Sequence, residues 1–183
     1  MGSVRAMIRQ GLLLGLMMWL AGCATAIDGA RYQATEPAFD LFAFFDGSVK
    51  AWGLVQGRDG ELIQRFEVAI EGSIEGDQLT LDETFTYGFG EGVESRVWTI
   101  TRGADGSYSG RAGDVSGEAR GRSYGNAFHW QYAMDIPVRG QMLEVKFSDW
   151  FWALDEQRLM NRSYLQKFGV DVAEVTIFME RQY

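Results

Sequence analysis

Strict alternation of large apolar and small or polar side chains runs through Asn126-Ala127-Phe128-His129-Trp130-Gln131-Tyr132-Ala133-Met134-Asp135-Ile136. Successive side chains of an extended strand point to opposite faces, so this segment places all its bulky residues on one face. These residues are Phe128, Trp130, Tyr132, Met134 and Ile136. A pairing shift of one residue would turn all of them to solvent, so we expect this face to point into a buried interior.

The same alternation recurs along the rest of the chain, from Phe39 onward. Residues 62–70 and 173–179 show it most clearly, and glycine-containing turns separate such segments at intervals of roughly 10–15 residues. The chain has only two prolines, and no apolar stripe of helical period continues for more than about ten residues. The pattern therefore predicts a run of sequential antiparallel strands.

A run of strands with one wet face each leaves unpaired edges unless the sheet closes on itself. We therefore predict an all-β fold: an antiparallel up-and-down β-barrel of eight to ten strands, preceded by a signal peptide helix. An open sandwich of two sheets is the alternative. A barrel of about eight strands has an interior that either side chains or one small ligand can fill.

The N-terminus has the layout of an export signal, with Arg5 and Arg9 ahead of an apolar run over residues 11–20. That run is shorter than the roughly 20 residues of a membrane-spanning helix. The following Leu20-Ala21-Gly22-Cys23 resembles the lipobox of bacterial lipoproteins, in which the cysteine is acylated and becomes the mature N-terminus. The alternative is a buried thiol after an ordinary signal peptide.

This resemblance, the small and polar residues 24–37 that end at Pro37, and the alternation from Phe39 onward together predict three parts. They are a lipoprotein signal peptide over 1–22, a lipidated N-terminus and tether over 23–37, and the barrel domain over 38–183. Ala24 and Thr25 follow the cysteine. By resemblance to the sorting pattern of Gram-negative lipoproteins, the absence of Asp at the second mature position implies the outer membrane. The expected location is therefore the cell envelope, as an outer membrane lipoprotein that faces the periplasm.

The charge of the chain limits its partners. The net charge is −8, and loss of residues 1–22 removes two arginines and makes it more negative. Phosphate backbones and anionic lipid headgroups repel such a surface, so we expect no nucleic-acid partner. Cys23 is the only cysteine, and once it is lipidated the chain has no disulfide and no thiol chemistry.

Charged residues that share a face with apolar ones are the first candidates for a site. Glu83 falls on the apolar face of residues 79–87, and Arg96 shares a face with Trp98. If Leu79 pairs with Ile100 across the intervening loop, Glu83 comes to oppose Arg96. We expect an inward ion pair between them with Asp114 nearby, on a strand where Gly110 and Ala112 leave room for Trp98. The set could fix the strand register, orient a ligand, or act in catalysis.

A second polar cluster extends from Asp149 to Gly169. Its alternating aromatic and charged residues could cap one barrel mouth; alternatively, Asp149 and Asp155 satisfy turn backbones while Arg162 packs on a tryptophan. The candidate ligand-binding residues from both clusters and from the central strand are Glu83, Arg96, Trp98, Asp114, Trp130, Tyr132, Asp149, Trp150, Asn161 and Arg162.

Several kinds of active site lack their residues in this sequence. His129 is the only histidine and falls on the outward face of its strand, where we expect it to be solvated; a histidine-rich metal site or a Ser-His-Asp triad is therefore not expected. There is no phosphate-binding loop, because no helix follows the glycines of residues 88–92. We predict no cofactor, no metal and no assigned catalytic residue, although acid–base catalysis by carboxylates alone stays open.

Short sequence segments spread over most of the mature chain resemble those of a family of bacterial lipoproteins known as domain of unknown function 3833. They are Phe44-Phe45-Asp46-Gly47, Ala51-Trp52-Gly53, Leu81-Asp82-Glu83, Arg96-Val97-Trp98-Thr99-Ile100, Asp114-Val115-Ser116-Gly117-Glu118-Ala119, Asp149-Trp150, Asn161-Arg162 and Lys167-Phe168-Gly169. The resemblance implies a lipid-anchored envelope protein of lipocalin-like shape, without an assigned activity or ligand.

Together these observations favour a binding protein: a membrane-anchored β-barrel that holds or carries an apolar, lipid-like molecule. The first alternative is a structural or assembly lipoprotein whose barrel is filled by its own side chains. The second is a lipid-modifying enzyme that uses inward carboxylates. Cavity volume separates the first two, since small-molecule pockets start at about 300 Å³.

Overall fold

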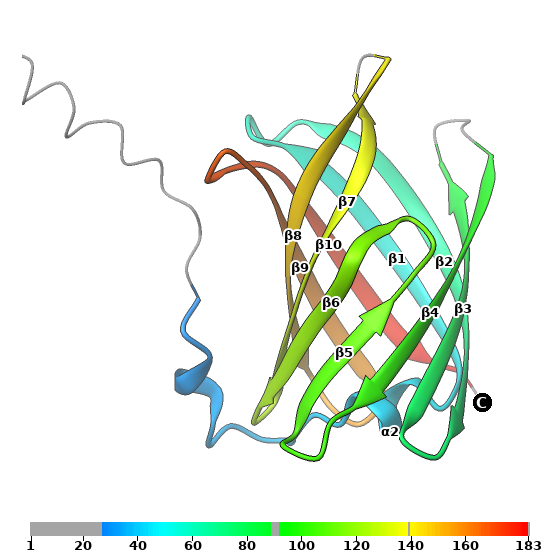
Figure 1. Cartoon of the computed structure of the whole chain (residues 1–183), viewed down its shortest axis with the longest axis vertical. Helices are drawn as coiled ribbons and strands as arrows, with labels where there is room; N and C mark the ends of the chain where they lie inside the picture. The colour runs from blue at the N-terminus through cyan, green and yellow to red at the C-terminus, as the bar shows by residue number, and fades with distance from the viewer. Residues whose placement is uncertain (1–26, 89–91, 139, 183) are drawn as a thin grey trace, which may run out of the picture.

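Ten antiparallel strands close into one barrel in the computed structural model, which describes residues 27–88, 92–138 and 140–182 (Figure 1). The strands are β1 (Gly47–Gly57), β2 (Leu62–Glu75), β3 (Gln78–Tyr87), β4 (Val93–Arg102), β5 (Ser107–Arg111), β6 (Val115–Tyr124), β7 (Ala127–Val138), β8 (Gln141–Ala153), β9 (Arg158–Lys167) and β10 (Val170–Arg181). Each strand pairs with its neighbours in sequence, and β1 pairs with β10. The predicted up-and-down barrel is confirmed, and the open sandwich is wrong.

Side-chain alternation sets the interior as predicted. In β7, Phe128 is 1% exposed and Trp130 is 5% exposed, and both belong to the main apolar core. The β3–β4 register pairs Leu79 with Ile100 and Glu83 with Arg96, as the sequence predicted. The barrel is thus organised around one shared apolar interior.

A short helix closes one end of the barrel. The helix α2 (Leu41–Phe45) lies across the lower end in Figure 1. The Asp40 carboxylate caps it by accepting hydrogen bonds from Phe42 N (2.9 Å) and Ala43 N (3.2 Å). On β2, a Cβ atom at Gly72 would stand 1.6 Å from the Phe45 carbonyl oxygen, so only glycine permits this close approach. The sequence predicted extended chain here; five residues are too few for a helical period to be recognised.

Residues 27–37, part of the predicted tether, pack against the barrel. The 3₁₀ helix η2 (Gly29–Tyr32) lies on the outer wall, where Ile27 and Tyr32 contact a second apolar cluster around Trp150. Thr35 Oγ1 lies 2.5 Å from Asn126 Oδ1. These contacts hold the segment in place, because Ile27 and Tyr32 bury apolar surface against Trp150 and Trp152.

Residues 1–22, predicted as the signal peptide, and Cys23 lie outside the described residues. No helix within the described residues has the length and apolar character of a membrane span.

The barrel wall is lower on one side. Strand β5 pairs with β4 only at Thr99–Arg102, and β6 pairs with β7 only up to Met134, so the β5–β6 hairpin ends about halfway up the barrel (Figure 1). Asp114 lies in the turn at the tip of this hairpin. The prediction that Asp114 lies on a strand is therefore wrong, because the strand ends at Arg111 and the chain reverses.

Candidate functional site

The barrel encloses a cavity of about 320 Å³, whose lining is mainly aromatic and aliphatic. Residues Leu41 and Phe45 of α2 form part of its lining at the closed end. On one wall, Tyr132 stacks on Phe147 with ring centroids 4.9 Å apart, and Trp98 meets Tyr132 edge-on at 5.4 Å. Such contacts fix the orientation of the rings and give the cavity a defined shape.

Glycines on the β5–β6 hairpin make room for Trp130. A Cβ at Gly110 would stand 2.7 Å from Trp130 Cζ2, and one at Gly121 would stand 2.4 Å from Trp130 Cε3. The sequence predicted that Gly110 would accommodate Trp98. The neighbour is Trp130 instead, because β7 pairs with β6 and places Trp130 opposite Gly121.

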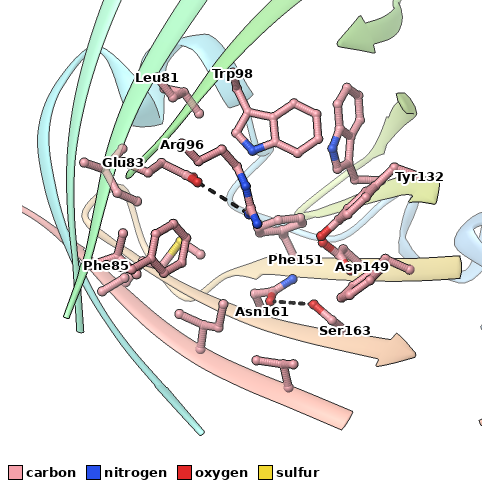
Figure 2. A pocket seen from close by; sticks show the side chains of 18 of the residues that line it. Leu81, Glu83, Phe85, Arg96, Trp98, Tyr132, Asp149, Phe151, Asn161 and Ser163 are labelled. Atoms are coloured by element: carbon pink, nitrogen blue, oxygen red, sulfur yellow. Dashed lines mark hydrogen bonds and ion pairs between the residues drawn. The ribbon is translucent and has the colours of Figure 1, made fainter. Parts of the chain in front are cut away.

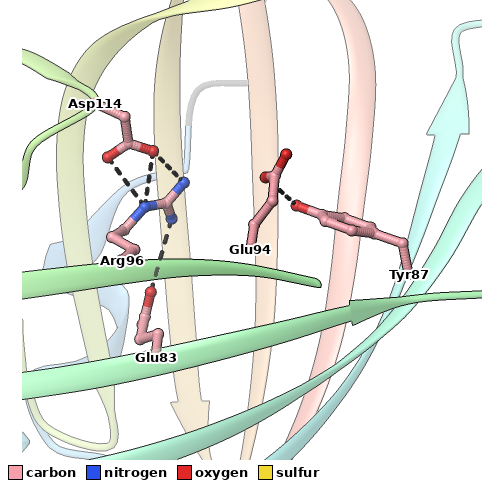
Figure 3. Close-up of polar contacts among 5 residues, drawn as sticks. All are labelled: Glu83, Tyr87, Glu94, Arg96 and Asp114. Carbon is pink, nitrogen blue, oxygen red and sulfur yellow. Dashed lines mark hydrogen bonds and ion pairs between the residues drawn. The ribbon is translucent and has the colours of Figure 1, made fainter. Parts of the chain in front are cut away.

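Three charged residues meet at the tip of the β5–β6 hairpin, on the side where the barrel wall is short (Figure 3). Arg96 Nε lies 2.9 and 3.1 Å from the Asp114 carboxylate oxygens, and Arg96 Nη2 lies 2.6 Å from Asp114 Oδ2. The distance from Arg96 Nη1 to Glu83 Oε2 is 3.7 Å. The predicted inward pair is present with Asp114 beside it, but the strong, two-pronged contact of the guanidinium is with Asp114.

A second polar group lies across the cavity, on β7, β8 and β9 (Figure 2). Asn161 Nδ2 donates to the Trp150 carbonyl oxygen at 3.2 Å, and Ser163 Oγ donates to Asn161 Oδ1 at 3.2 Å. Asp149 is 6% exposed, and the Tyr132 hydroxyl interacts with its carboxyl group. The sequence analysis missed Ser163, although it shares the inward face of its strand with Asn161.

Burial dominates the electrostatics of the two cavity carboxyl groups. It raises the pKa of Glu83 to about 7, against the lowering effect of Arg96. It also raises the pKa of Asp149 to about 7, against the lowering effects of Ser163 and Tyr132. For Arg96, burial disfavours the cation, but Glu83 and Asp114 outweigh it and raise the pKa of the guanidinium.

Two buried acceptors in this cavity lack a hydrogen bond. Within the described residues, Glu83 Oε2 and Asp149 Oδ1 are buried side-chain oxygens without a hydrogen-bond partner. Buried polar atoms of folded proteins are normally paired. The cavity therefore presents unused acceptor capacity on opposite walls.

The structure brings together seven of the ten predicted ligand-binding residues as cavity lining: Glu83, Arg96, Trp98, Trp130, Tyr132, Asp149 and Asn161. Asp114 holds Arg96 from the hairpin tip without lining the cavity.

Trp150 and Arg162 do not belong to the cavity lining. Trp150 is buried in the outer cluster against η2, and Arg162 Nε lies 3.8 Å from Glu174 Oε2. Asp149–Trp150 and Asn161–Arg162 are adjacent pairs on strands, so one member of each must point outward.

His129 is the outward residue whose surroundings differ most from expectation. Its ring stacks on Trp150 with centroids 4.2 Å apart, and Nε2 lies 2.9 Å from Ser148 Oγ. Burial lowers the pKa of His129 to about 4. The prediction of a solvated histidine is wrong, because the tryptophan on the neighbouring strand covers it.

Asp155 stabilises a turn, as one interpretation of the second cluster predicted, but that interpretation is wrong for Asp149, which lies within β8 and lines the cavity. Asp155 Oδ1 accepts hydrogen bonds from Gln157 N (2.9 Å) and Arg158 N (2.8 Å). Among the described residues, no three His, Cys, Asp or Glu side chains are grouped so that they could hold a metal ion.

Comparisons with known proteins agree with this architecture. The structure is similar to that of an S-type phycobiliprotein lyase from Guillardia theta, with a TM-score of 0.57 and 10% sequence identity; the match covers 78% of this chain and 90% of the lyase chain. At this identity the likeness concerns the fold, a lipocalin-like barrel. No curated protein matches the sequence. The model of the family described as "Protein of unknown function (DUF3833)" matches residues 17–181, and the chain therefore belongs to that family.

Proposed function

We propose that the protein binds one apolar or amphipathic small molecule of lipid-like character inside its barrel. The observation that carries this proposal is the cavity of about 320 Å³. Small-molecule sites of proteins occupy about 300–1,000 Å³ and combine an apolar lining with a few polar groups. A barrel filled by its own side chains, the structural alternative, would leave no such volume.

The ligand enters at the end of the barrel opposite α2. Helix α2 blocks the lower end (Figure 1), whereas the hairpin tips at the upper end expose apolar side chains such as Ile63, Val93 and Met142. The short β5–β6 hairpin lowers the wall further on that side. An apolar rim of this kind supports the transfer of a hydrophobic molecule into the cavity.

Acyl anchoring at Cys23 would keep this activity at the cell envelope. The lipobox-like sequence before Cys23 supports the anchor, and two or more acyl chains make membrane attachment stable. Packing of residues 27–32 on the barrel leaves a short connection, at most about 14 Å from Cys23 to Ile27. Incorporation of labelled palmitate into the protein, and its loss in Cys23→Ala, tests the anchor.

Binding is tested with residues 24–183, which keep every described contact of the barrel. N-phenyl-1-naphthylamine, an apolar fluorescent probe, should gain fluorescence with saturable binding, and native mass spectrometry should detect co-purified apolar molecules. Val55→Trp places a bulky ring on the cavity lining near the open end and should abolish binding. Leu54→Trp adds the same ring on the exposed outer face and should leave binding unchanged. Absence of binding to the unmodified barrel would refute the proposal.

A lipid-modifying enzyme is the second candidate, and the raised pKa values of Glu83 and Asp149 favour it. Carboxyl groups with a pKa near neutrality can act as general acid or base. Glu83→Gln should then abolish conversion of a bound lipid while binding persists. Release of an unaltered ligand from the purified protein would contradict this candidate.

A further inference from the structure

We propose that the ligand's polar end is an uncharged or cationic hydrogen-bond donor, such as a hydroxyl, amide or amine group, and that it donates to Glu83 or Asp149. The inference depends on the proposed ligand-binding function and adds the chemical class of the ligand. It excludes free fatty acids and other anionic amphiphiles as the preferred ligands.

The donors around the polar part of the cavity are already engaged. Arg96 directs Nε and Nη2 to Asp114 and Nη1 toward Glu83. The Asn161 amide donates to the backbone of β8, and the Ser163 hydroxyl donates to Asn161. A carboxylate ligand would have to compete with Glu83 for Arg96 Nη1, or displace one of the hydrogen-bonded partners.

One oxygen of each carboxyl group, by contrast, lacks a hydrogen bond, although Glu83 Oε2 lies 3.7 Å from Arg96 Nη1. Both groups are largely buried: the Glu83 side chain is 14% exposed and Asp149 is 6% exposed. An unsatisfied buried acceptor destabilises the protein, and a donor that reaches it recovers the lost interaction. The two carboxyl groups lie on β3 and β8 and both line the cavity (Figure 2). A polar end in this part of the cavity, beside Arg96, can therefore donate to one of the two carboxyl groups.

The charges of the cavity lining also disfavour an anionic ligand. Arg96 is the only basic side chain of the cavity lining within the described residues, and Asp114 already neutralises it. Glu83 and Asp149 repel each other enough that Asp149 contributes to the raised pKa of Glu83. A further negative charge beside them would add to this repulsion, whereas a cation would relieve it.

Dodecanol, dodecylamine and dodecanoate share one alkyl chain and differ only in the polar end, so they isolate its contribution. Dodecylamine and dodecanoate are used below their critical micelle concentrations and dodecanol below its solubility limit. Each displaces N-phenyl-1-naphthylamine from residues 24–183, and the dissociation constants are compared. Dodecanol and dodecylamine should each bind at least about tenfold more tightly than dodecanoate, since tenfold corresponds to one hydrogen bond of ordinary strength.

Substitution of the carboxyl groups should remove this preference. Glu83→Gln and Asp149→Asn keep the side-chain shape and add N–H donors, so the advantage of dodecylamine over dodecanoate should shrink about tenfold in each. Asp135→Asn makes the same charge change on the outward face of β7, where the side chain is exposed, and should leave the preference unchanged. Circular dichroism confirms that each variant is folded.

The outcomes separate the two proposals. If neither the probe nor any dodecyl compound binds, the ligand-binding function itself is wrong. If all three bind and dodecanoate binds as tightly as dodecanol, the barrel binds apolar molecules but the donor inference is wrong. If the preference persists in both cavity variants, or is lost equally in Asp135→Asn, the carboxyl groups do not select the ligand and the inference also fails.

Discussion

Arg96 faces Glu83 in the β3–β4 register, but its nearest acidic partner is Asp114: the Nη2–Oδ2 distance is 2.6 Å, against 3.7 Å from Nη1 to Glu83 Oε2. The turn residue thus draws the guanidinium away from the buried carboxyl group. Glu83 Oε2 consequently keeps only this longer ion pair and has no hydrogen bond. This competition between two acids for one cation underlies the first two predictions.

Replacement of Asp114 should release Arg96 toward Glu83. Asp114→Ala removes a two-pronged, partly exposed contact, so we expect the free energy of unfolding to fall by about 1 kcal/mol. The freed guanidinium can then pair with Glu83 or with an anionic ligand. Dodecanoate should therefore bind more tightly to Asp114→Ala than to the unmodified protein in the displacement assay. Unchanged dodecanoate binding would show that Arg96 stays fixed without Asp114.

Stability should fall as the pH rises from about 4.5 to about 7. The pKa values of Glu83 and Asp149 are about 7 in the folded protein, above their ordinary values. In this window the folded protein keeps protons that the unfolded chain has released, so a rise in pH favours unfolding. Chemical denaturation should show a decrease of a few kcal/mol in the unfolding free energy, the order expected from two such shifts.

Two variants identify the groups responsible for that slope. Glu83→Gln and Asp149→Asn should each flatten part of the dependence. Besides the two carboxyl groups themselves, the groups that influence the pKa of either one are Arg96, Asp114, Asp82, Ser163 and Tyr132. If the slope in both variants equals that of the unmodified protein, groups other than Glu83 and Asp149 cause the pH dependence of stability.

Gly121→Ala should destabilise the barrel, because the added methyl group would collide with Trp130. Its Cβ would lie 2.4 Å from the indole ring, and overpacking of this kind costs about 1–3 kcal/mol. Gly113→Ala is the matched control on the same hairpin, since its Cβ would meet nothing within 4 Å. Thermal unfolding of the two variants should therefore diverge, and equal melting temperatures would contradict the packing described for Trp130.

Phe168→Gly should stabilise the protein. Phe168 has a φ of 53° in the β9–β10 turn, a left-handed conformation that costs an ordinary residue about 1–2 kcal/mol. Its side chain is 92% exposed, so little packing is lost. Gly169→Ala should have the opposite effect, because Gly169 has a φ of 78°. Denaturant unfolding measures both, and a less stable Phe168→Gly variant would indicate that the ring makes contacts that stabilise the fold.

The sequence was most informative where side chains alternate. Alternation in residues 126–136 and the spacing around Glu83 and Arg96 were enough to predict a closed barrel and one correct strand register, because a register shift would expose a whole apolar face. Neighbouring residues of a strand point to opposite faces, so strict use of alternation would have placed only one of Asp149 and Trp150 in the cavity. It would also have added Ser163 to the predicted cavity residues, because Ser163 follows Asn161 by two positions and shares its face.

Features that depend on tertiary contacts were not predictable. The helix α2 has only five residues, and its position follows from burial of its phenylalanines at the barrel end. The packing of residues 27–32 requires Trp150 and Tyr124 on the outer wall, which come from distant strands. The environment of His129 likewise depends on a ring from the neighbouring strand. Local patterns carry no information on such pairings.

Closure of the lower end by α2 leaves the barrel interior open at one end only (Figure 1). If the barrel binds a ligand as proposed, that molecule must leave by the opening through which it entered. Release of the ligand would then depend on its affinity for the membrane or protein at that opening. The fraction of barrels that hold a ligand would reflect the balance between the site that supplies the ligand and the site that receives it. A barrel closed at one end is therefore compatible with the proposed storage or transfer of a ligand.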